Sequence, residues 1–240
     1  MKILKNSNEP RHKVTLVCCV HGNEVFGSDV FDYFADRLDE FTGLSLILAN
    51  EKALKENKRF IDSDLNRVFP GNPQGDYENR LASSLLRVID PSSYIIDIHT
   101  TTSPLDFTPI ITNYNKGTRQ ILNQCSSKEI VLMENGSKSL IAQFKSGVSL
   151  EYGEGYVKNN SVIPSIEKMV KLLITGKGVL SRPRKLFRCS SVLPKDFDLP
   201  PKSENFKEIE GTNILPFLIF EKYYTEYAGF SLQPAKIVIV

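Results

Sequence analysis

The 240-residue sequence predicts an α/β fold in which short buried strands alternate with helices that carry one apolar face. The first observation is a series of nearly continuous apolar, β-branched runs, of which the run at residues 14–20 is the clearest. The second is the helical spacing of apolar residues between the runs, as at residues 25–38. The third is the presence of glycine and proline clusters, which separate one element from the next.

The remaining elements are predicted in the same way. Strands are expected at residues 44–49, 93–98, 107–112, 130–133 and 146–152, and helices at residues 78–88 and 161–175. Much of residues 55–80 is expected to be loop, because this segment is polar and contains the cluster Phe69-Pro70-Gly71-Asn72-Pro73.

The character of the sequence changes near residue 177. Gly176-Lys177-Gly178 follows the last predicted helix, and the chain beyond it has many prolines and short β-like runs at residues 179–188, 214–220 and 236–240. We therefore predict an α/β domain over residues 1–177 and a small β-rich domain over residues 178–240.

Composition and charge exclude several classes of protein. Thirty basic residues oppose 28 acidic ones, and the formal charge of +2 favours neither nucleic acid nor an acidic membrane. No apolar stretch approaches the ~20 residues of a membrane-spanning helix, and the N-terminus does not resemble a signal peptide. The four cysteines fit neither a disulfide framework nor a paired zinc-knuckle spacing. We expect a cytoplasmic protein with reduced thiols and no nucleic-acid or membrane partner.

Two polar motifs stand where predicted buried strands end. His21-Gly22-Asn23-Glu24 places a histidine and a carboxylate three positions apart, with Gly22 allowing the backbone to bend, and Asp97-Ile98-His99 closes another strand. Ligand sites of open α/β sheets lie beyond the carboxyl ends of strands, where these residues are expected to meet. Two histidines and one glutamate around an open position form the ligand set of a catalytic zinc ion. We therefore predict a zinc site at His21, Glu24 and His99.

Each feature taken alone has a second interpretation. A histidine at a strand end is often a hydrogen-bonded structural residue, and Asp97 either orients a ligand histidine or only stabilises its strand. Residues 58–71 are either a solvated loop or a recognition segment. The Asp-x-Asp-Leu-Asn-Arg block in this segment favours recognition, since Arg59 and Arg67 suit carboxylates and a developing oxyanion.

Several motifs together indicate a family. They are His21-Gly22-Asn23-Glu24, Arg59, Asp64-Leu65-Asn66-Arg67, Asp97-Ile98-His99-Thr100 and Ser149-Leu150-Glu151-Tyr152-Gly153. In combination they resemble the succinylglutamate desuccinylase/aspartoacylase family, a branch of the zinc carboxypeptidase-like hydrolases. The resemblance is strongest over residues 14–105 and thins in the C-terminal region. It implies a mixed central sheet flanked by helices, followed by a small β domain that partly covers the active site.

The resemblance implies a role for each matching residue. His21, Glu24 and His99 match the ligands of one zinc ion per chain. Glu151 matches the glutamate that serves as general base toward the attacking water and then as acid toward the leaving amine. Arg59 matches the arginine that polarises the scissile carbonyl. From the residues alone, Glu151 ends a predicted strand and could equally be a surface carboxylate.

Further matches concern the substrate. Asn66 and Arg67 match the residues that hold its carboxylate. The pair Tyr223-Tyr224 resembles a tyrosine pair of which one hydroxyl reaches the substrate, and we favour Tyr223. These aromatic residues could instead belong to the core of the small domain.

The resulting prediction is a zinc-dependent amidohydrolase that cleaves a small-molecule N-acyl amino acid into a carboxylic acid and an amino acid. Aspartoacylases carry an arginine upstream of the catalytic glutamate, whereas this chain offers only Lys138 and Lys145 there, and lysine lacks the bidentate fork. The acyl group, the amino acid and the formation of a homo-oligomer therefore stay open. Two alternatives are a zinc carboxypeptidase acting on short peptides or cell-wall fragments, and a non-catalytic metal-binding protein.

Overall fold

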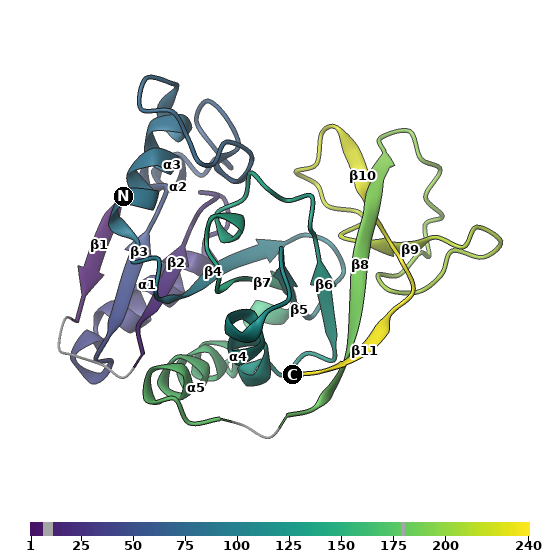
Figure 1. Cartoon of the computed structure of the whole chain (residues 1–240). Helices are drawn as coiled ribbons and strands as arrows, with labels where there is room; N and C mark the ends of the chain where they lie inside the picture. The colour runs from purple at the N-terminus through teal and green to yellow at the C-terminus, as the bar shows by residue number, and fades with distance from the viewer. Residues whose placement is uncertain (7–11, 179–180) are drawn as a thin grey trace.

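The computed structural model describes residues 1–6, 12–178 and 181–240, and Figure 1 shows the helices and strands. The helices are α1 (Phe26–Ala35), α2 (Glu51–Lys55), α3 (Tyr77–Val88), α4 (Lys116–Gln124) and α5 (Val162–Thr175). The strands are β1 (Lys2–Lys5), β2 (Val14–Cys18), β3 (Leu44–Leu48), β4 (Tyr94–Thr101), β5 (Phe107–Ile111), β6 (Glu129–Leu132), β7 (Gly147–Gly153), β8 (Pro183–Pro194), β9 (Leu215–Phe217), β10 (Tyr227–Leu232) and β11 (Lys236–Ile239). Of the helices in these ranges, none is long and apolar enough to cross a membrane.

The strands form one mixed sheet, as the predicted fold class requires. Their order is β1-β3-β2-β4-β7-β5-β6-β8-β10-β9, and β11 pairs with β8. Strands β3, β2, β4 and β7 run parallel to one another. Strand β5 is antiparallel to β7, and β5, β6 and β8 again run parallel. The crossovers between the parallel strands are made largely by helices, which places helices over the sheet.

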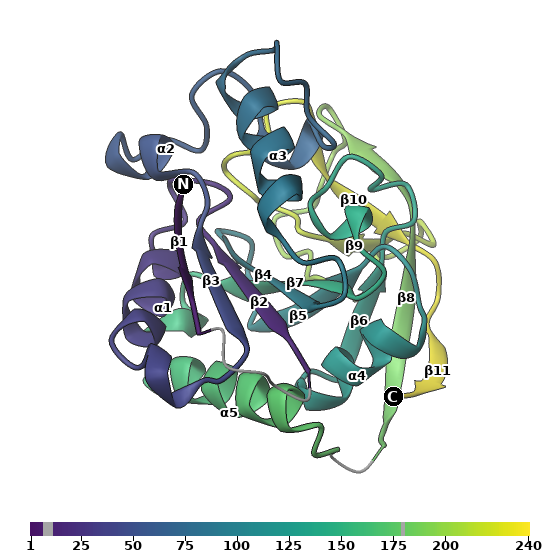
Figure 2. The same ribbon diagram turned by 60° about the vertical axis from the view of Figure 1, so that its left-hand side comes forward.

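Helices and loops cover both faces of the sheet, because side chains alternate along each strand. In β2, Leu16 packs in the core layer that contains α1, α4 and α5, whereas Val17 packs in the layer that contains α3. Figure 2 shows α3 on one side of the sheet and α4 and α5 on the other.

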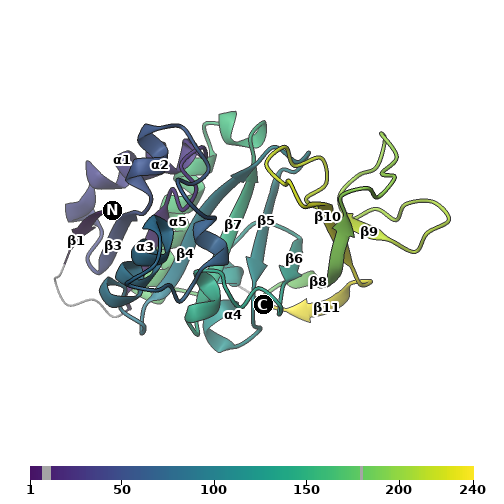
Figure 3. The same ribbon diagram turned by 90° about the horizontal axis from the view of Figure 1, so that it is seen from above.

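The C-terminal part is β-rich, as predicted, but it continues the main sheet. Strand β8 pairs with β6 through residues 185–188 and with β10 through residues 189–194. Figure 3 shows β9 and β10 beyond the helix-covered body, with β8 joining the two regions. Because β8 pairs with strands of both regions, the domain division at residue 177 stays a prediction. Residues 179–180, where the first predicted C-terminal run begins, lie outside the described residues.

Candidate metal centre and active site

Three neighbouring parallel strands bring the predicted site together. Strands β2, β4 and β7 lie side by side, so their carboxyl ends meet at one edge of the sheet. His21 and Glu24 lie in the turn between β2 and α1, His99 lies in β4, and Glu151 lies in β7. His99 and Glu151 are direct register partners, so their side chains emerge on the same face of the sheet.

The turn that carries His21 packs tightly against α2. A Cβ atom on Gly22 would lie 2.1 Å from the carbonyl carbon of Ala53, a distance at which only glycine fits. The Gly22 N–H donates to the Arg59 carbonyl at 3.1 Å, which joins this turn to the polar loop after α2. Gly22 is therefore required for close packing, in addition to the bend that the sequence suggests.

His21, Glu24 and His99 form a compact buried cluster. The Glu24 carboxylate lies between the two imidazoles, with Oε1 2.6 Å from His21 Nδ1 and Oε2 2.9 Å from His99 Nδ1. One candidate ligand atom from each residue lies within 4.8 Å of the others. Burial raises the pKa of Glu24, but the two histidines outweigh burial and lower that pKa overall. The three predicted ligands thus share one site.

The outer nitrogens of both histidines contact carboxylates. Asp64 Oδ1 lies 3.1 Å from His21 Nε2, and Asp97 Oδ2 lies 2.7 Å from His99 Nε2. Burial opposes the charged form of His99, but Asp97 and Glu24 outweigh it and raise the pKa of this imidazole. Carboxylates in this position fix the ring orientation and increase the basicity of a ligand histidine.

The chemistry of these donors fits a divalent metal. Two imidazole nitrogens and one carboxylate form the three-ligand set of catalytic zinc sites, which leaves a further position for water or substrate. The Nδ1 atoms of both histidines face the Glu24 carboxylate. Each Nε2 atom contacts a further carboxylate, which orients its ring. Imidazole also suits other first-row metals, so the donors specify the class of metal more closely than its identity.

Glu151 stands beside this cluster and lines the same cavity. Loss of solvent raises the pKa of its carboxyl to about 7, with a further rise caused by Glu24 and Glu221 and opposition from His99 and His21. A carboxyl group with a pKa close to neutral pH is suited both to accept and to release a proton.

Arg59 lies against the metal cluster through a carboxylate that also holds His21. Its Nε and Nη2 atoms each lie 3.1 Å from Asp64 Oδ2. Its Nη1 atom lies 3.6 Å from Glu24 Oε1. The guanidinium is therefore oriented by Asp64, with one nitrogen directed toward the predicted metal ligands.

Asn66 and Arg67 extend the polar wall of the site. Asn66 Nδ2 lies 3.3 Å from His99 Nε2, and Asn66 Oδ1 accepts a hydrogen bond from the Leu140 backbone at 2.9 Å. Arg67 Nη2 donates to the Tyr227 hydroxyl at 2.8 Å. The structure thus brings both predicted substrate-binding residues to the cavity, and it adds Tyr227 as a partner from the C-terminal part.

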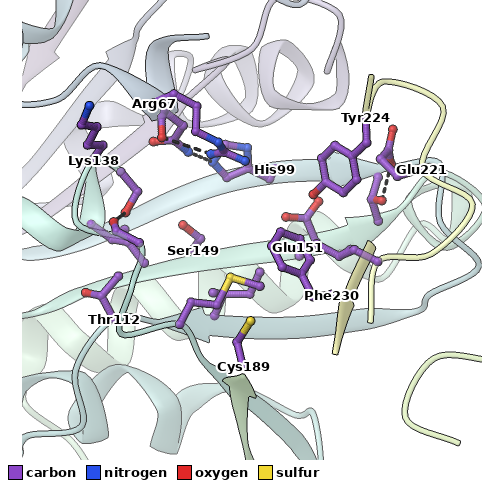
Figure 4. A pocket seen from close by; sticks show the side chains of 18 of the residues that line it. Arg67, His99, Thr112, Lys138, Ser149, Glu151, Cys189, Glu221, Tyr224 and Phe230 are labelled. Carbon is purple, nitrogen blue, oxygen red and sulfur yellow. Dashed lines mark hydrogen bonds between the residues drawn. The ribbon is translucent and has the colours of Figure 1, made fainter. Parts of the chain in front are cut away.

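The tyrosine that enters the site is Tyr224, in place of the favoured Tyr223. Tyr224 lines the cavity, and Figure 4 shows its hydroxyl directed toward Glu151. Tyr223 is 44% exposed and is not part of the lining. Glu221 orients this turn, because its carboxylate accepts hydrogen bonds from the backbone of Thr102 at 2.7 Å and of Tyr223 at 3.1 Å.

These residues surround a cavity of about 510 Å³. Its wall includes an apolar group made of Ile110, Met133, Ile141, Leu218 and Phe230. Figure 4 shows Cys189 across the cavity from His99 and Arg67. The C-terminal part of the chain supplies Cys189, Ser191, Val192, Leu218, Glu221, Tyr224, Tyr227 and Phe230. It therefore covers the site from one side, as the family resemblance implies.

Comparison with known proteins identifies the family. The model of the succinylglutamate desuccinylase/aspartoacylase catalytic domain matches residues 10–174, which is more than half of the chain. The protein belongs to this family. The resemblance found in the sequence motifs is thereby confirmed.

Curated relatives align with part of this family member. The probable aspartoacylase of Trichodesmium erythraeum (strain IMS101) is 31% identical over 136 residues, which cover 49% of this chain and 45% of the relative. The N-acyl-aromatic-L-amino acid amidohydrolase (carboxylate-forming) of Rattus norvegicus is 30% identical over 117 residues, which cover 42% and 37% of the two chains. The chain thus spans less than half the length of these relatives in the matched segments.

Solved structures extend the likeness to the whole family fold. Murine aminoacylase 3 has a TM-score of 0.77 at 21% identity, with 98% of both chains covered. The succinylglutamate desuccinylase from Chromobacterium violaceum has a TM-score of 0.71 at 19% identity, with 94% of this chain and 85% of that chain covered. These likenesses establish a shared mixed sheet with flanking helices.

Besides Tyr227, Asp64 and Glu221 contribute to this site without having been predicted to have a role. Asp64 orients both His21 and Arg59, and its only signal in the sequence is its place in the Asp-x-Asp-Leu-Asn-Arg block. Glu221 lies in the cavity wall and accepts a hydrogen bond from the Thr101 hydroxyl, two residues beyond His99 in β4. Its only signal is its position two residues before the tyrosine pair.

Proposed function

We propose that this protein is a zinc-dependent hydrolase that cleaves the amide bond of N-acyl amino acids, releasing a carboxylic acid and an amino acid. The observation that carries the proposal is the Glu24 carboxylate between two imidazole Nδ1 atoms, with Glu151 as the register partner of His99. This arrangement combines a metal ligand set with a separate proton acceptor at one strand edge. Membership in the family agrees with it.

Different residues of the chain have different roles in this reaction. When bound, zinc supplies a Lewis acid for the acyl carbonyl and lowers the pKa of water. Glu151 takes a proton from the attacking water and delivers it to the departing nitrogen. Arg59 donates to the acyl oxygen as that oxygen gains charge, and Asp64 holds the guanidinium in place for this task. Arg67 binds the carboxylate of the substrate.

The cavity wall favours a substrate amino acid with an apolar side chain. Ile110, Met133 and Leu218 offer apolar surface, and burying such surface stabilises a bound apolar group. Among the described residues of the wall, Lys138 is the one lysine, and it adds a positive charge to those of the two arginines. Its ammonium is a mobile point charge, which selects weakly for an acidic side chain.

A substrate panel tests this function. We expect protein reconstituted with zinc to hydrolyse N-acetylphenylalanine and N-acetylleucine with a higher kcat/KM than N-acetylaspartate, and chelation to abolish the activity. Released amino acid is measured for the metal-free and the reconstituted enzyme. Turnover of N-blocked dipeptides in preference to these substrates would indicate a carboxypeptidase instead. Bound zinc without turnover of either group would indicate a non-catalytic metal-binding protein.

A pair of tyrosine variants separates the two aromatic residues of the 223–224 turn. Tyr224→Phe removes the hydroxyl that is directed toward Glu151 in Figure 4. It should lower kcat/KM by about 10-fold, the usual effect of losing one hydrogen bond to a charged group. Tyr223→Phe is the matched control and should behave as the parent, because Tyr223 is exposed and is not part of the cavity lining. A loss of activity in the control and not in Tyr224→Phe would reverse the assignment.

A further inference from the structure

Glu78, in the first turn of α3, is a fully buried carboxylate outside the proposed reaction. Its Oε1 atom accepts hydrogen bonds from Ile61 N at 2.7 Å and Asn50 Nδ2 at 3.1 Å. Its Oε2 atom accepts from Asp62 N at 2.9 Å and Ser63 N at 3.2 Å. A buried charge is costly unless its hydrogen-bonding capacity is used, and here four donors surround it.

The three backbone donors belong to the loop that carries the catalytic arginine. Residues 58–64 form neither helix nor strand, so their N–H groups lack the partners that a regular element would provide. Residues 61–63 lie between Arg59 and Asp64, and the Arg59 carbonyl also accepts from Gly22 in the His21 turn. The loop is thus fixed to the metal-ligand turn at its start and to Glu78 at its middle.

Two side chains of this loop depend on its position for their contacts. Asp64 reaches His21 Nε2 at 3.1 Å, and it also accepts from Arg59 Nε at 3.1 Å. A backbone shift of the loop would move the orienting carboxylate and the arginine together. Misplacement of such groups by about 1 Å costs on the order of 100-fold in rate.

We propose that Glu78 is a positioning residue for the reaction, whose buried carboxylate holds residues 61–63 and thereby sets the placement of Arg59 and Asp64. The inference deepens the proposed hydrolase function and rests on it. Glu78 is not part of the cavity lining and bonds to none of the predicted metal ligands, so it acts through the groups that it holds, residues 61–63 and Asn50.

Glu78→Gln tests the proposal because it preserves shape but turns one acceptor into an NH₂ donor that faces backbone N–H groups. We expect kcat to fall by about 10- to 100-fold with a smaller change in KM, since Arg59 acts mainly on the transition state. Hydrogen exchange followed by mass spectrometry should show lost protection in peptides that cover residues 59–64. The zinc affinity, measured by chelator competition, should also fall because Asp64 orients His21.

The matched control is Thr118→Ala in α4, on the opposite face of the sheet. Thr118 is also fully buried, and its hydroxyl accepts from Asn115 N at 2.9 Å. This variant should lose thermal stability while keeping the parent kcat, zinc affinity and loop protection. The same pattern in Glu78→Gln would reduce Glu78 to a structural residue and overturn the proposal.

Two further readouts keep the test decisive. If Glu78→Gln does not fold, Glu78→Asp keeps the charge but withdraws it by one methylene, and the same comparison with Thr118→Ala applies to it. If the parent hydrolyses no substrate in the panel, the proposed function fails, while loop protection and zinc affinity still decide the role of Glu78. Unchanged loop protection in the folded Glu78 variant would contradict the inference under either condition.

Discussion

A Glu151→Gln variant is expected to keep its fold and its zinc but to lose kcat by about 10²- to 10⁴-fold, the usual contribution of a general acid–base group. The amide has nearly the shape of the carboxyl but cannot accept a proton from water at neutral pH. Because Glu151 is the register partner of His99 and is not one of the three clustered ligands, its loss should leave the zinc content unchanged.

The pH profile adds a second measurement for Glu151. The parent should lose kcat/KM as the pH falls through the pKa of this carboxyl, since only its deprotonated form acts as a base. Burial raises that pKa to about 7, and a nearby bound cation lowers it, so the acidic limb should lie at or below neutral pH. Glu154→Gln, which alters an exposed carboxylate just beyond β7, is the matched control. Parent-like turnover in Glu151→Gln would remove this residue from the mechanism.

The strand-end motifs explain how much of the site the sequence could predict. His21, Glu24 and His99 each lie in or just after a strand that its run of apolar, β-branched residues predicts from the sequence alone. Because β2 and β4 are adjacent and parallel, residues at their carboxyl ends meet without further information. The same reasoning placed Glu151 at this edge once β7 was recognised as a strand.

Other parts of the fold carry weaker local signals. The edge strand β1 is only partly buried, and α4 presents few apolar residues, so neither was predicted. In the C-terminal part, the buried residues of β10, Gly229 and Leu232, are three positions apart and its pairing with β8 is irregular, so the strand lacks the alternation that would reveal it. The continuity of β8 with the main sheet depends on pairing partners far apart in the chain, which no short pattern encodes.

Contacts between distant segments account for the rest of the difference. Tyr224 enters the cavity because Glu221 bonds to Thr102, a residue 119 positions earlier. Asp64 acts through His21, 43 positions away. Residue spacing predicts neighbours on one helix or strand, whereas such pairings follow only from the assembled fold.

His99→Ala is expected to have the largest effect, the loss of both bound zinc and activity. The substitution removes the Nδ1 atom that lies 2.9 Å from Glu24 Oε2 and leaves two of the three clustered ligands. It also leaves the buried Asp97 with Ser149 Oγ at 3.3 Å as the remaining described partner of its Oδ2 atom. Zinc per chain, measured after dialysis by elemental analysis, should fall from about one to near zero, as expected when a three-ligand site loses a ligand.

A graded series distinguishes loss of a ligand from loss of the fold. Asp97→Asn keeps His99 but replaces the carboxylate next to its Nε2 atom with a neutral amide. This variant should lower zinc affinity by about 10- to 100-fold. His12→Ala changes a histidine two residues before β2, beyond the end of the strand that is opposite the site, and should bind zinc as the parent does. Zinc at 100 times its Kd should stabilise the parent by about 2.7 kcal/mol, but should not stabilise His99→Ala. A His99→Ala protein that retains one zinc per chain would show that the metal is held elsewhere, because two ligands at this site cannot reproduce the affinity of three.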